Sequence, residues 1–479
     1  LIVPGKEEAH DGLLHVRAPT FQLPGYDDVR VSMPLEHHRK TIHRLLKDWK
    51  ADVIHVSTPG PFGFLGIKLA RQLRLPLVGI YHTDFPAYVE EIVRLQVANA
   101  RNDPRRMFWP LLRSLWPRPK GRGGLRVEDL QELNPNLKSD IQTVRETVKR
   151  NADLLTSEVD IAELLSSLAR SLAERVLSRL YANFTFVVSR SPTHAETVQR
   201  TLGISADQIR CLVPGTDVDK FHPAHRNRQL WEQYHIPASA FVALYVGRVT
   251  PEKNIPLLLD VWRRVLAGNE GRDLRLVIVG SGEPGLLAEA ASLPGVHTVG
   301  PQFDAALAAL YASADLLVFP SFTETLGQVG LEAGASGLPV LVSDCGGPRS
   351  YVAHERTGYV LRAGSPQPWA ETILMLSRNQ PLCRQLGAQA REHIAVHHTL
   401  EASLRSYFDI HCEARELAAQ AAEARNRPRP ASRRNCLGVR GDDRPGILVI
   451  TDYHAGRRFG TSKHRIQKEA AIEKMLRSA

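Results

Sequence analysis

The stretch that decides the fold is Ser-Phe-Thr-Glu-Thr-Leu-Gly-Gln-Val-Gly-Leu-Glu-Ala, residues 321–333. An apolar run at residues 316–319 precedes it and ends at Pro320, which predicts a buried strand. A short polar loop follows, and we expect a helix to begin near Thr325 and to continue to Ser336. In open α/β sheets ligands bind where strands end and helices begin, and a helix start presents free N–H groups to an anion.

Two carboxylates, Glu324 and Glu332, frame this loop and helix. Glu324 precedes the expected helix start, and Glu332 lies about two turns further along, where a carboxylate can accept from a pair of sugar hydroxyls. One anion-binding end and two carboxylates suit a sugar that is joined to a phosphate. The alternative interpretation is an amphipathic helix that carries two solvated glutamates.

A second strand end carries two cations. Residues 241–246 predict a strand, and Arg248 and Lys253 lie in the turn between it and an expected helix at 255–267. Two cations at such a turn can neutralise a diphosphate and stabilise it as a leaving group.

Two further strands end in glycines. The strand at 276–279 closes at Gly280, where the lack of a side chain lets a backbone approach a ligand. The strand at 339–343 is followed by a Gly-Gly-Pro turn at 346–348.

Together these motifs resemble the C-terminal half of family 4 glycosyltransferases of the GT-B architecture. The matching residues are Gly247-Arg248, Glu252-Lys253-Asn254, Val279-Gly280-Ser281-Gly282, Glu324, Glu332, Ala333 to Pro339, and Gly346-Gly347-Pro348. The family's usual aromatic residue after Glu-x is Leu326 in this chain, which is a mild departure.

The resemblance implies a retaining hexosyltransferase that uses a nucleotide-diphosphate sugar. Arg248 and Lys253 would hold the diphosphate, and Glu332 would hold the ribose. Glu324 would be catalytic and would hold the donor sugar. The remaining implied donor-binding positions are Gly280, Thr325, Leu326 and Gly327.

The N-terminal half alternates strands and helices. Strands are expected at 51–56, 76–81, 185–189 and 209–213, with helices at 63–73 and 192–202, which predicts a doubly wound parallel sheet. Residues 59–63 and 81–86 resemble bacterial GDP-mannose-dependent mannosyltransferases and sulfolipid-type transferases, in which the position of His82 approaches the donor sugar. His82 is therefore a catalytic candidate, with a structural histidine as the alternative. The family's opening strand and Gly-Gly turn are missing, and the chain begins at Leu1, so we expect a fragment.

The composition and net charge of the chain limit the classes of binding partner that we expect. The chain has 479 residues, a net charge of +10 and a pI of about 9.4, which fits nucleic acid, an anionic membrane or phosphorylated substrates. No nucleic-acid-binding motif occurs, so that partner is excluded. The five scattered cysteines contain no Cys-x-x-Cys, and no apolar run is long enough to span a membrane. We expect a cytoplasmic protein that is peripheral at the inner face of the membrane.

A segment within residues 95–180 departs from the family. Basic residues alternate with Trp109, Trp116 and other apolar residues between Arg101 and Arg122, a mixture that suits a lipid interface. The alternative is a packed hairpin with a solvated basic edge. Apolar residues recur at helical spacing over 141–180, which predicts long helices.

Two acidic motifs raise the question of a metal. Asp217 and Asp219 imitate the Asp-x-Asp of another glycosyltransferase architecture, but we interpret the motif as a decoy because Arg248 and Lys253 already supply positive charge. The strand at 446–456 contains Asp452-x-His454, which resembles the first metal-binding motif of calcineurin-like metallophosphoesterases, with coincidence as the alternative. We expect no metal in the transferase and no cofactor.

The predicted architecture is α/β, GT-B, with two Rossmann-like doubly wound domains that face a cleft and a helical insertion in the first. The acceptor would be a lipid or glycan, and the donor GDP-mannose or a UDP-sugar. The alternatives are a bifunctional transferase–phosphoesterase and a non-catalytic sugar-nucleotide or membrane-binding protein. The expected parts are an acceptor-side domain at 1–212, a nucleotide-sugar domain at 213–395, helices at 396–425, a basic linker at 426–445 and the start of a further domain at 446–479.

Overall fold

A computed structural model describes residues 2–4, 9–10, 13–16, 20–22, 30–32, 34–57, 60–81, 86, 89–90, 93–94, 158–426, 447–450 and 453–454. The chain forms two compact units. Unit 1 comprises Leu1–Ser189, Thr197–Arg210 and Phe408–Ala479, and unit 2 comprises Arg190–Glu196 and Cys211–Tyr407. Each unit contains a mainly parallel sheet with helices, so the predicted α/β class is confirmed.

Unit 2 is built on a six-stranded parallel sheet in the order β12-β11-β10-β13-β14-β15. The strands are nearly continuous apolar runs because both faces of a parallel sheet are covered. Strand order reverses between β10 and β13, and this switch point is where ligands of such sheets bind. The strand bounds are β10 (Phe241–Val246), β11 (Leu274–Val279), β12 (Val296–Gly300), β13 (Leu316–Phe319), β14 (Val340–Ser343) and β15 (Gly358–Leu361).

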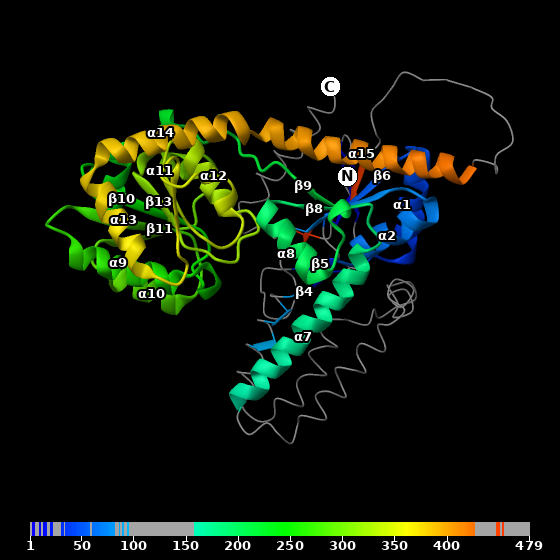
Figure 1. Cartoon of the computed structure of the whole chain (residues 1–479), viewed down its shortest axis with the longest axis horizontal. Helices are drawn as coiled ribbons and strands as arrows, with labels where there is room; N and C mark the ends of the chain where they lie inside the picture. The colour runs from blue at the N-terminus through cyan, green and yellow to red at the C-terminus, as the bar shows by residue number, and fades with distance from the viewer. Residues whose placement is uncertain are drawn as a thin grey trace. The chain divides into compact units, whose positions relative to one another are not determined.

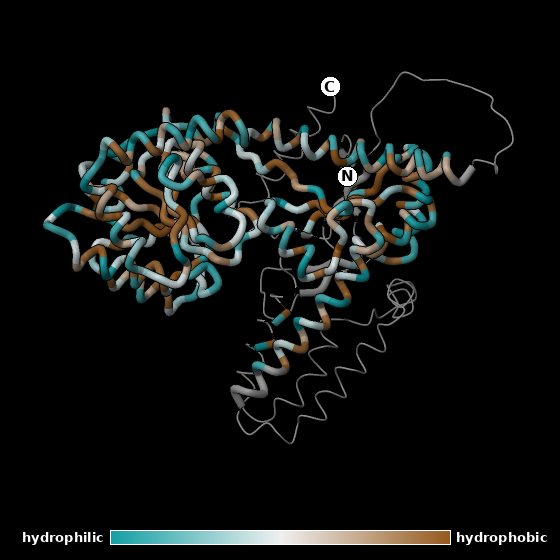
Figure 2. The backbone as a smooth tube through the Cα atoms, viewed as in Figure 1, coloured by the Kyte–Doolittle hydropathy of each residue, from teal (hydrophilic) through white to brown (hydrophobic). Residues whose placement is uncertain are grey.

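Helices cover both faces of this sheet. Helices α9, α10 and α13 lie on one face, and α11, α12 and α14 lie on the other (Figure 1). Figure 2 shows the hydrophobic residues concentrated along the strands and the hydrophilic ones along the outer helix surfaces. The bounds are α9 (Ile255–Gly268), α10 (Pro284–Ser292), α11 (Asp304–Ser313), α12 (Gln328–Ala335), α13 (Pro366–Arg378), α14 (Gln380–His397) and α15 (Leu400–Asn426), with short 3-10 helices η1 (Ala206–Gln208), η2 (Pro223–His225), η3 (Arg228–Tyr234), η4 (Pro251–Lys253) and η5 (Pro348–Ser350).

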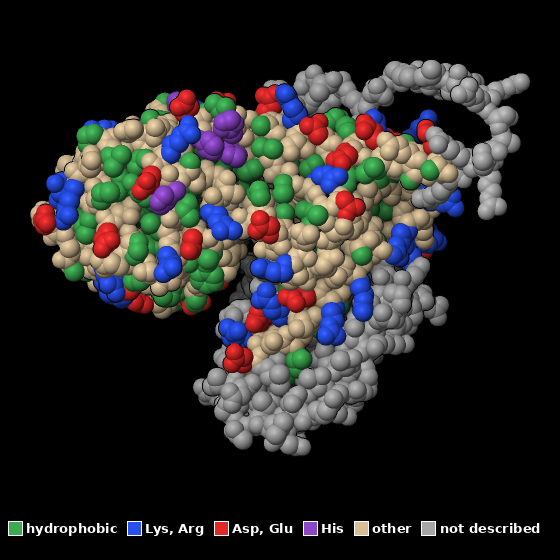
Figure 3. All heavy atoms as spheres, in the orientation of Figure 1, with side chains coloured by type: hydrophobic (Ala, Val, Ile, Leu, Met, Phe, Trp, Pro, Cys, Tyr) green, Lys and Arg blue, Asp and Glu red, His purple; other side chains and the backbone are tan. Residues whose placement is uncertain are grey.

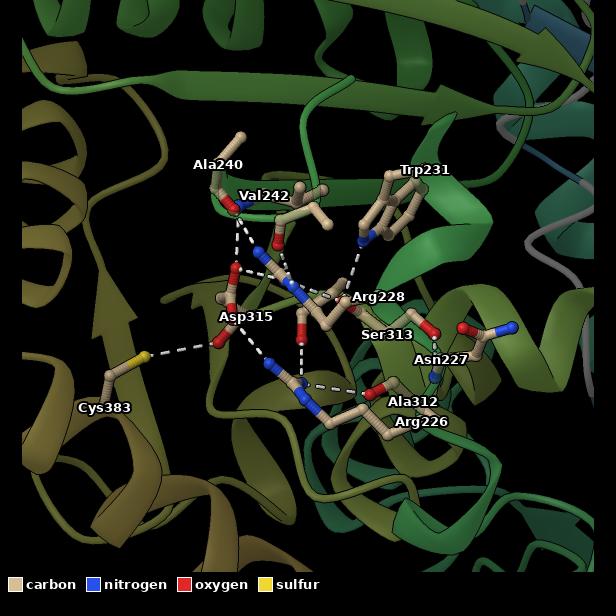
Figure 4. A network of polar contacts seen from close by, with 12 residues as sticks. Arg226, Asn227, Arg228, Trp231, Ala240, Val242, Ala312, Ser313, Asp315 and Cys383 are labelled. Atoms are coloured by element: carbon tan, nitrogen blue, oxygen red, sulfur yellow. Dashed lines mark hydrogen bonds and ion pairs between the residues drawn. The ribbon is translucent and has the colours of Figure 1, made fainter. Parts of the chain in front are cut away.

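A polar network anchors the edge of the unit 2 sheet where β10 and β13 begin. Asp315 precedes β13, and its two carboxylate oxygens accept from Arg226 at 3.0 Å and from Arg228 at 2.9 Å (Figure 4). The backbone N–H of Val242 also donates to this carboxylate, at 2.9 Å. Figure 4 shows both guanidiniums converging on Asp315. The network therefore fixes the strand starts, while ligands of such sheets bind at the opposite edge, where the strands end.

Unit 1 contains a sheet in the order β2-β3-β1-β16-β6-β7-β8-β9. Strand β16 (Ile447–Ile450) pairs in parallel with β6 along its whole length and with β1 at Ile2. In the doubly wound order 3-2-1-4-5-6, this central position belongs to the first strand. The late segment that the sequence assigns to a further domain thus occupies this central position in the unit 1 sheet. The other strands are β1 (Ile2–Pro4), β2 (Ala9–His10), β3 (Leu13–Val16), β6 (Val53–Val56), β7 (Leu77–Tyr81), β8 (Phe186–Ser189) and β9 (Ile209–Cys211).

A small sheet and several helices accompany the large sheet of unit 1. Its strands β17, β5 and β4 lie in that order. The bounds are β4 (Thr20–Gln22), β5 (Arg30–Ser32), β17 (Tyr453–His454), α1 (Glu36–Asp48), α2 (Pro61–Leu73), α7 (Glu158–Tyr181) and α8 (Pro192–Leu202). Helix α7 lies almost wholly within residues 141–180, where the spacing of apolar residues predicts long helices.

Surface features of the described residues bear on the membrane question. No helix in the described part of the chain is long and apolar enough to cross a bilayer. Figure 3 shows basic and acidic side chains interspersed over the face in view, so the described residues there form no large patch of one sign. The basic and aromatic segment between Arg101 and Arg122 lies outside the described residues.

Candidate active site

Two loops meet at the switch point of the unit 2 sheet. Lys253, after β10, places its Nζ 2.5 Å from Oε1 of Glu324, after β13. Both side chains are largely buried, at 15% and 19% exposed. The Thr323 hydroxyl also donates to the Glu252 carbonyl at 3.1 Å, which ties the same loops together. The structure thus brings one predicted diphosphate ligand against the predicted sugar ligand.

Arg248 lies in the loop after β10. Its guanidinium forms an ion pair with Glu252 at 3.1 Å, and both side chains are exposed. The Tyr245 hydroxyl donates to the Arg248 carbonyl at 2.7 Å and so holds the loop backbone. Burial raises the pKa of Tyr245, and the negative charge of Glu324 raises it further. Tyr245 therefore stays a neutral donor to the backbone of this loop.

Glycines allow these loops to pack backbone against backbone. Gly280 has φ +149°, and a Cβ at this position would lie 1.9 Å from the Gly247 carbonyl oxygen. Gly346 has φ +75°, and its neighbour Gly347 donates its N–H to the Glu324 carbonyl at 2.7 Å. A residue larger than glycine at position 280 would push the two loops apart. Both glycine motifs thus shape the loops that carry the charged side chains.

Helix α12 begins later than the sequence indicates. We expected its start near Thr325, but the helix starts at Gln328 because Gly327 has φ +73°, a left-handed conformation that helical residues do not adopt. The Tyr351 hydroxyl donates to the Gly327 carbonyl at 2.5 Å and fixes this turn. Leu326 is 1% exposed and packs in the core, so only its backbone is available for a ligand.

Glu332 lies inside unit 2 rather than on its surface. Its side chain is 8% exposed, and its Oε2 accepts from the Tyr311 hydroxyl at 3.1 Å. Burial raises the pKa of Tyr311, and the charge of Glu332 adds to the effect. With Glu324 also largely buried, the alternative of two solvated glutamates is wrong.

The sequence analysis did not single out Arg190. This residue directly follows β8, and its Nη2 donates to Oε1 of Gln328 at 3.4 Å. Burial lowers the pKa of the Arg190 guanidinium, while the charge of Glu324 opposes this effect. The Ser191 hydroxyl donates to the Thr325 carbonyl at 2.9 Å. An arginine at the carboxyl end of a predicted strand was the signal that could have identified it.

The remaining predicted residues have different outcomes. His82 and Asp452 lie outside the described residues, and His454 belongs to strand β17. Asp217 has a local role, because its Oδ1 accepts from the backbone N–H groups of Asp219 at 3.2 Å and Lys220 at 3.0 Å. Within the part of the chain that the structure describes, no group of three or more His, Cys, Asp or Glu side chains could hold a metal ion.

Comparisons with known proteins agree with these motifs. Residues 227–393 match the family model "Glycosyl transferases group 1", and residues 2–121 match "Glycosyltransferase Family 4". A D-inositol 3-phosphate glycosyltransferase of Nocardia farcinica is 32% identical over 271 residues, which are 54% of this chain and 58% of that protein. A GDP-mannose-dependent alpha-mannosyltransferase of Mycobacterium tuberculosis is 27% identical over 364 residues, 75% of this chain and 73% of that protein. The chain thus spans little more than half of the first relative.

Solved structures share the fold. A glycosyltransferase from Rickettsia africae aligns with a TM-score of 0.54 and 15% identity, covering 84% of this chain and 86% of that one. A sucrose-phosphate synthase from Thermosynechococcus elongatus aligns with a TM-score of 0.51 and 21% identity, covering 86% of this chain and 84% of that one. The two family matches together cover more than half of the 479 residues. The chain therefore contains a glycosyltransferase family 4 region and a glycosyltransferase group 1 region, and it has the GT-B fold.

Proposed function

We propose that this protein transfers a sugar, with retention at the anomeric carbon, from a nucleotide-diphosphate sugar to a lipid or glycan acceptor. The observation that carries this proposal is the contact between Lys253 and Glu324 at the switch point of unit 2. A cation for a diphosphate and a carboxylate for sugar hydroxyls are held within hydrogen-bonding distance there, as a nucleotide sugar requires.

Each side chain has a separate task in this proposal. Arg248 and Lys253 would bind the diphosphate and stabilise the charge that develops as it leaves. Glu332 would accept from the ribose hydroxyls, and Glu324 from those of the sugar. The Gly330 N–H already donates to the Gly327 carbonyl at 3.0 Å, whereas the N–H groups of Gln328 and Val329 at the start of α12 would add donors.

No side chain of the described residues is assigned as a nucleophile. The departing diphosphate would instead guide the incoming hydroxyl from the same face of the sugar. His82 would approach the donor sugar from the acceptor side, a role that rests on the sequence motif alone.

GDP-mannose is the first choice of donor, with a UDP-sugar second. The motifs at 81–86 and the similarity to mannosyltransferases described as GDP-mannose-dependent support this order. We further propose a lipid acceptor reached at the inner face of an anionic membrane, from the basic and aromatic sequence of residues 101–122. Replacement of Trp109 and Trp116 by Ala should weaken binding to anionic vesicles. Equal binding by this variant, or none by the parent at low salt, would remove the membrane proposal.

A ligand screen tests the donor proposal. Unfolding of the chain would be followed by fluorescence with GDP, UDP, GDP-mannose and UDP-glucose, and release of nucleotide from each sugar would be measured in parallel. A ligand at a hundred times its Kd adds about 2.7 kcal/mol to stability, which is a clear thermal shift. The absence of any shift and of any donor hydrolysis would refute the proposal.

A further inference from the structure

The positive charges of Lys253 and Arg248 do not suffice to neutralise a diphosphate near Glu324, because both side chains already have carboxylate partners. Lys253 already faces Glu324, and Arg248 already faces Glu252. A nucleotide diphosphate brings about two negative charges to the site. The two predicted ligands can neutralise it only by sharing their charge with their own carboxylates. Additional cations without carboxylate partners at ion-pair distance would therefore supply the positive charge that a diphosphate needs.

Arg190 is one such cation. Its guanidinium donates to the neutral amide oxygen of Gln328 at 3.4 Å, and among the described residues no carboxylate lies within ion-pair distance of it. Burial lowers the pKa of the Arg190 guanidinium, and the charge of Glu324 offsets only part of this effect. An anion in direct contact with this side chain would offset more of the cost of burial.

Within the described part of the chain, Arg349 is the second cation without a carboxylate partner at ion-pair distance. It lies in η5, directly after the Gly-Gly-Pro turn that holds the Glu324 carbonyl, and its side chain is exposed. Its Nε donates to the Thr193 hydroxyl at 3.3 Å, and among the described residues it too has no carboxylate at ion-pair distance. By contrast, the neighbouring Lys253 has such a partner.

The two arginines are tied to the same short segment. Arg190 and Thr193 belong to residues 190–193, where α8 begins, and Arg349 contacts Thr193 directly. Helix α8 has 11 residues and no acidic residue in its first turn, so the positive end of its dipole faces this segment without a counter-charge from that turn. Arg190 therefore lies just before the start of α8, and Arg349 contacts the first turn of that helix, within unit 2.

We propose that Arg190 and Arg349 form an anion subsite beside Glu324 that binds a phosphate group. The planar fork of a guanidinium suits two oxygens of one phosphate. The phosphate would come either from the donor diphosphate or from a phosphate monoester on the acceptor. The proposal rests on the proposed function for the identity of its ligand, and the two sources are separated by experiment.

The probe is inorganic phosphate, titrated calorimetrically at constant ionic strength into the full chain. The parent should bind, and the double variant Arg190→Gln with Arg349→Gln should bind at least about tenfold more weakly, the effect of losing one charged hydrogen bond. Arg384→Gln, on the exposed side of α14, is the matched loss of charge and should bind as the parent does.

Arg190→Lys and the single variant Arg349→Gln keep the proposal testable if the double variant unfolds. Arg349→Gln changes an exposed side chain and should weaken phosphate binding without shifting the melting temperature. Unchanged binding in this variant and in Arg190→Lys, or an equal loss in Arg384→Gln, would overturn the subsite.

A second titration with saturating GDP or UDP identifies the source. Phosphate that is displaced by the nucleotide occupies the place of the donor diphosphate, whereas phosphate that still binds reports a separate site for the acceptor. Binding of GDP or UDP is measured separately, by calorimetry on the parent protein. A chain that binds phosphate through these arginines but no nucleotide would refute the proposed function and leave the subsite standing.

Discussion

Replacement of Lys253 by Met removes one charge from the candidate active site and keeps the length of the side chain. In the parent, Lys253 Nζ lies 2.5 Å from Glu324, and the two side chains are 15% and 19% exposed. Removing one partner of a buried pair costs about 3–5 kcal/mol, against about 1 kcal/mol or less for an exposed pair. A melting curve of the variant therefore separates a loss of stability from a loss of turnover.

The size of the kinetic effect follows from the chemistry. The ammonium would donate to the diphosphate as its negative charge develops, and loss of such a bond costs on the order of 2–4 kcal/mol in the transition state. This corresponds to a decrease in turnover of roughly 30- to 1,000-fold. Arg248→Ala should act in the same direction, since its guanidinium would contact the same group.

Turnover would be measured as nucleotide release from the best donor of the ligand screen, at saturating donor and with a melting curve for each variant. Arg384→Gln serves as the control for a change in net charge. If Lys253→Met and Arg248→Ala both retain turnover within about threefold of the parent, less than 1 kcal/mol was at stake, and the diphosphate clamp is wrong.

Four further outcomes are expected. Glu332→Gln should weaken binding of the nucleotide alone, and Glu324→Gln only that of the nucleotide sugar; equal losses for both ligands in calorimetry would contradict these roles. Asp315→Ala leaves two guanidiniums without their carboxylate and should lower the free energy of unfolding of unit 2 by about 3–5 kcal/mol. The control Asp273→Ala removes an exposed carboxylate and should cost less than about 1 kcal/mol. Similar urea midpoints for the two variants would exclude an anchoring role for Asp315. Val449→Pro removes a backbone donor from the middle of β16 and should destabilise unit 1 by about 3 kcal/mol or more. The measurement is the protection of the β6 amides from hydrogen exchange. Unchanged protection would show that β16 contributes nothing to the sheet. Transfer should survive a chelator, and activity that is lost and then restored by magnesium or manganese would require a metal.

The strand ends of unit 2 were predictable because their signals are local. Residues 241–246 and 316–319 are uninterrupted apolar runs, and the structure has strands with these bounds. The helix expected at 255–267 spans Ile255–Gly268. Since parallel strands are buried on both faces, their length can be read from hydrophobicity alone, and the polar residues that follow each run lie at one edge of the sheet.

The start of α12 depended on a backbone angle instead. Neither threonine nor leucine forbids a helix, so the residue types at 325 and 326 do not exclude an earlier start. Only the left-handed conformation of Gly327 moves the start of the helix to Gln328. This conformation is held by a hydroxyl from Tyr351, which is distant in sequence. A local pattern carries no information about such a contact.

Arg190 and the place of β16 in the unit 1 sheet were missed for a related reason, although the sequence did predict a strand there. The arginine follows a strand that the sequence assigns to the other half of the chain, yet it contacts Gln328 in unit 2. Strand β16 is separated by nearly the whole chain from Ile2, with which it pairs. Both features follow from which segments become neighbours after folding, whereas charge and hydrophobicity reveal only which segments become strands.

The ion pairs of the resting site also explain how it can stay folded without a donor. Lys253 and Glu324 are both largely buried, and each compensates the charge of the other. In the proposed function, an arriving diphosphate would give the ammonium a phosphate oxygen in exchange for the carboxylate, so its charge would stay compensated. The displaced Glu324 would then accept from the hydroxyls of the sugar. Nucleotide alone would satisfy the cation but not the carboxylate, and a nucleotide sugar would satisfy both, so we expect the pair to favour the intact donor over its product.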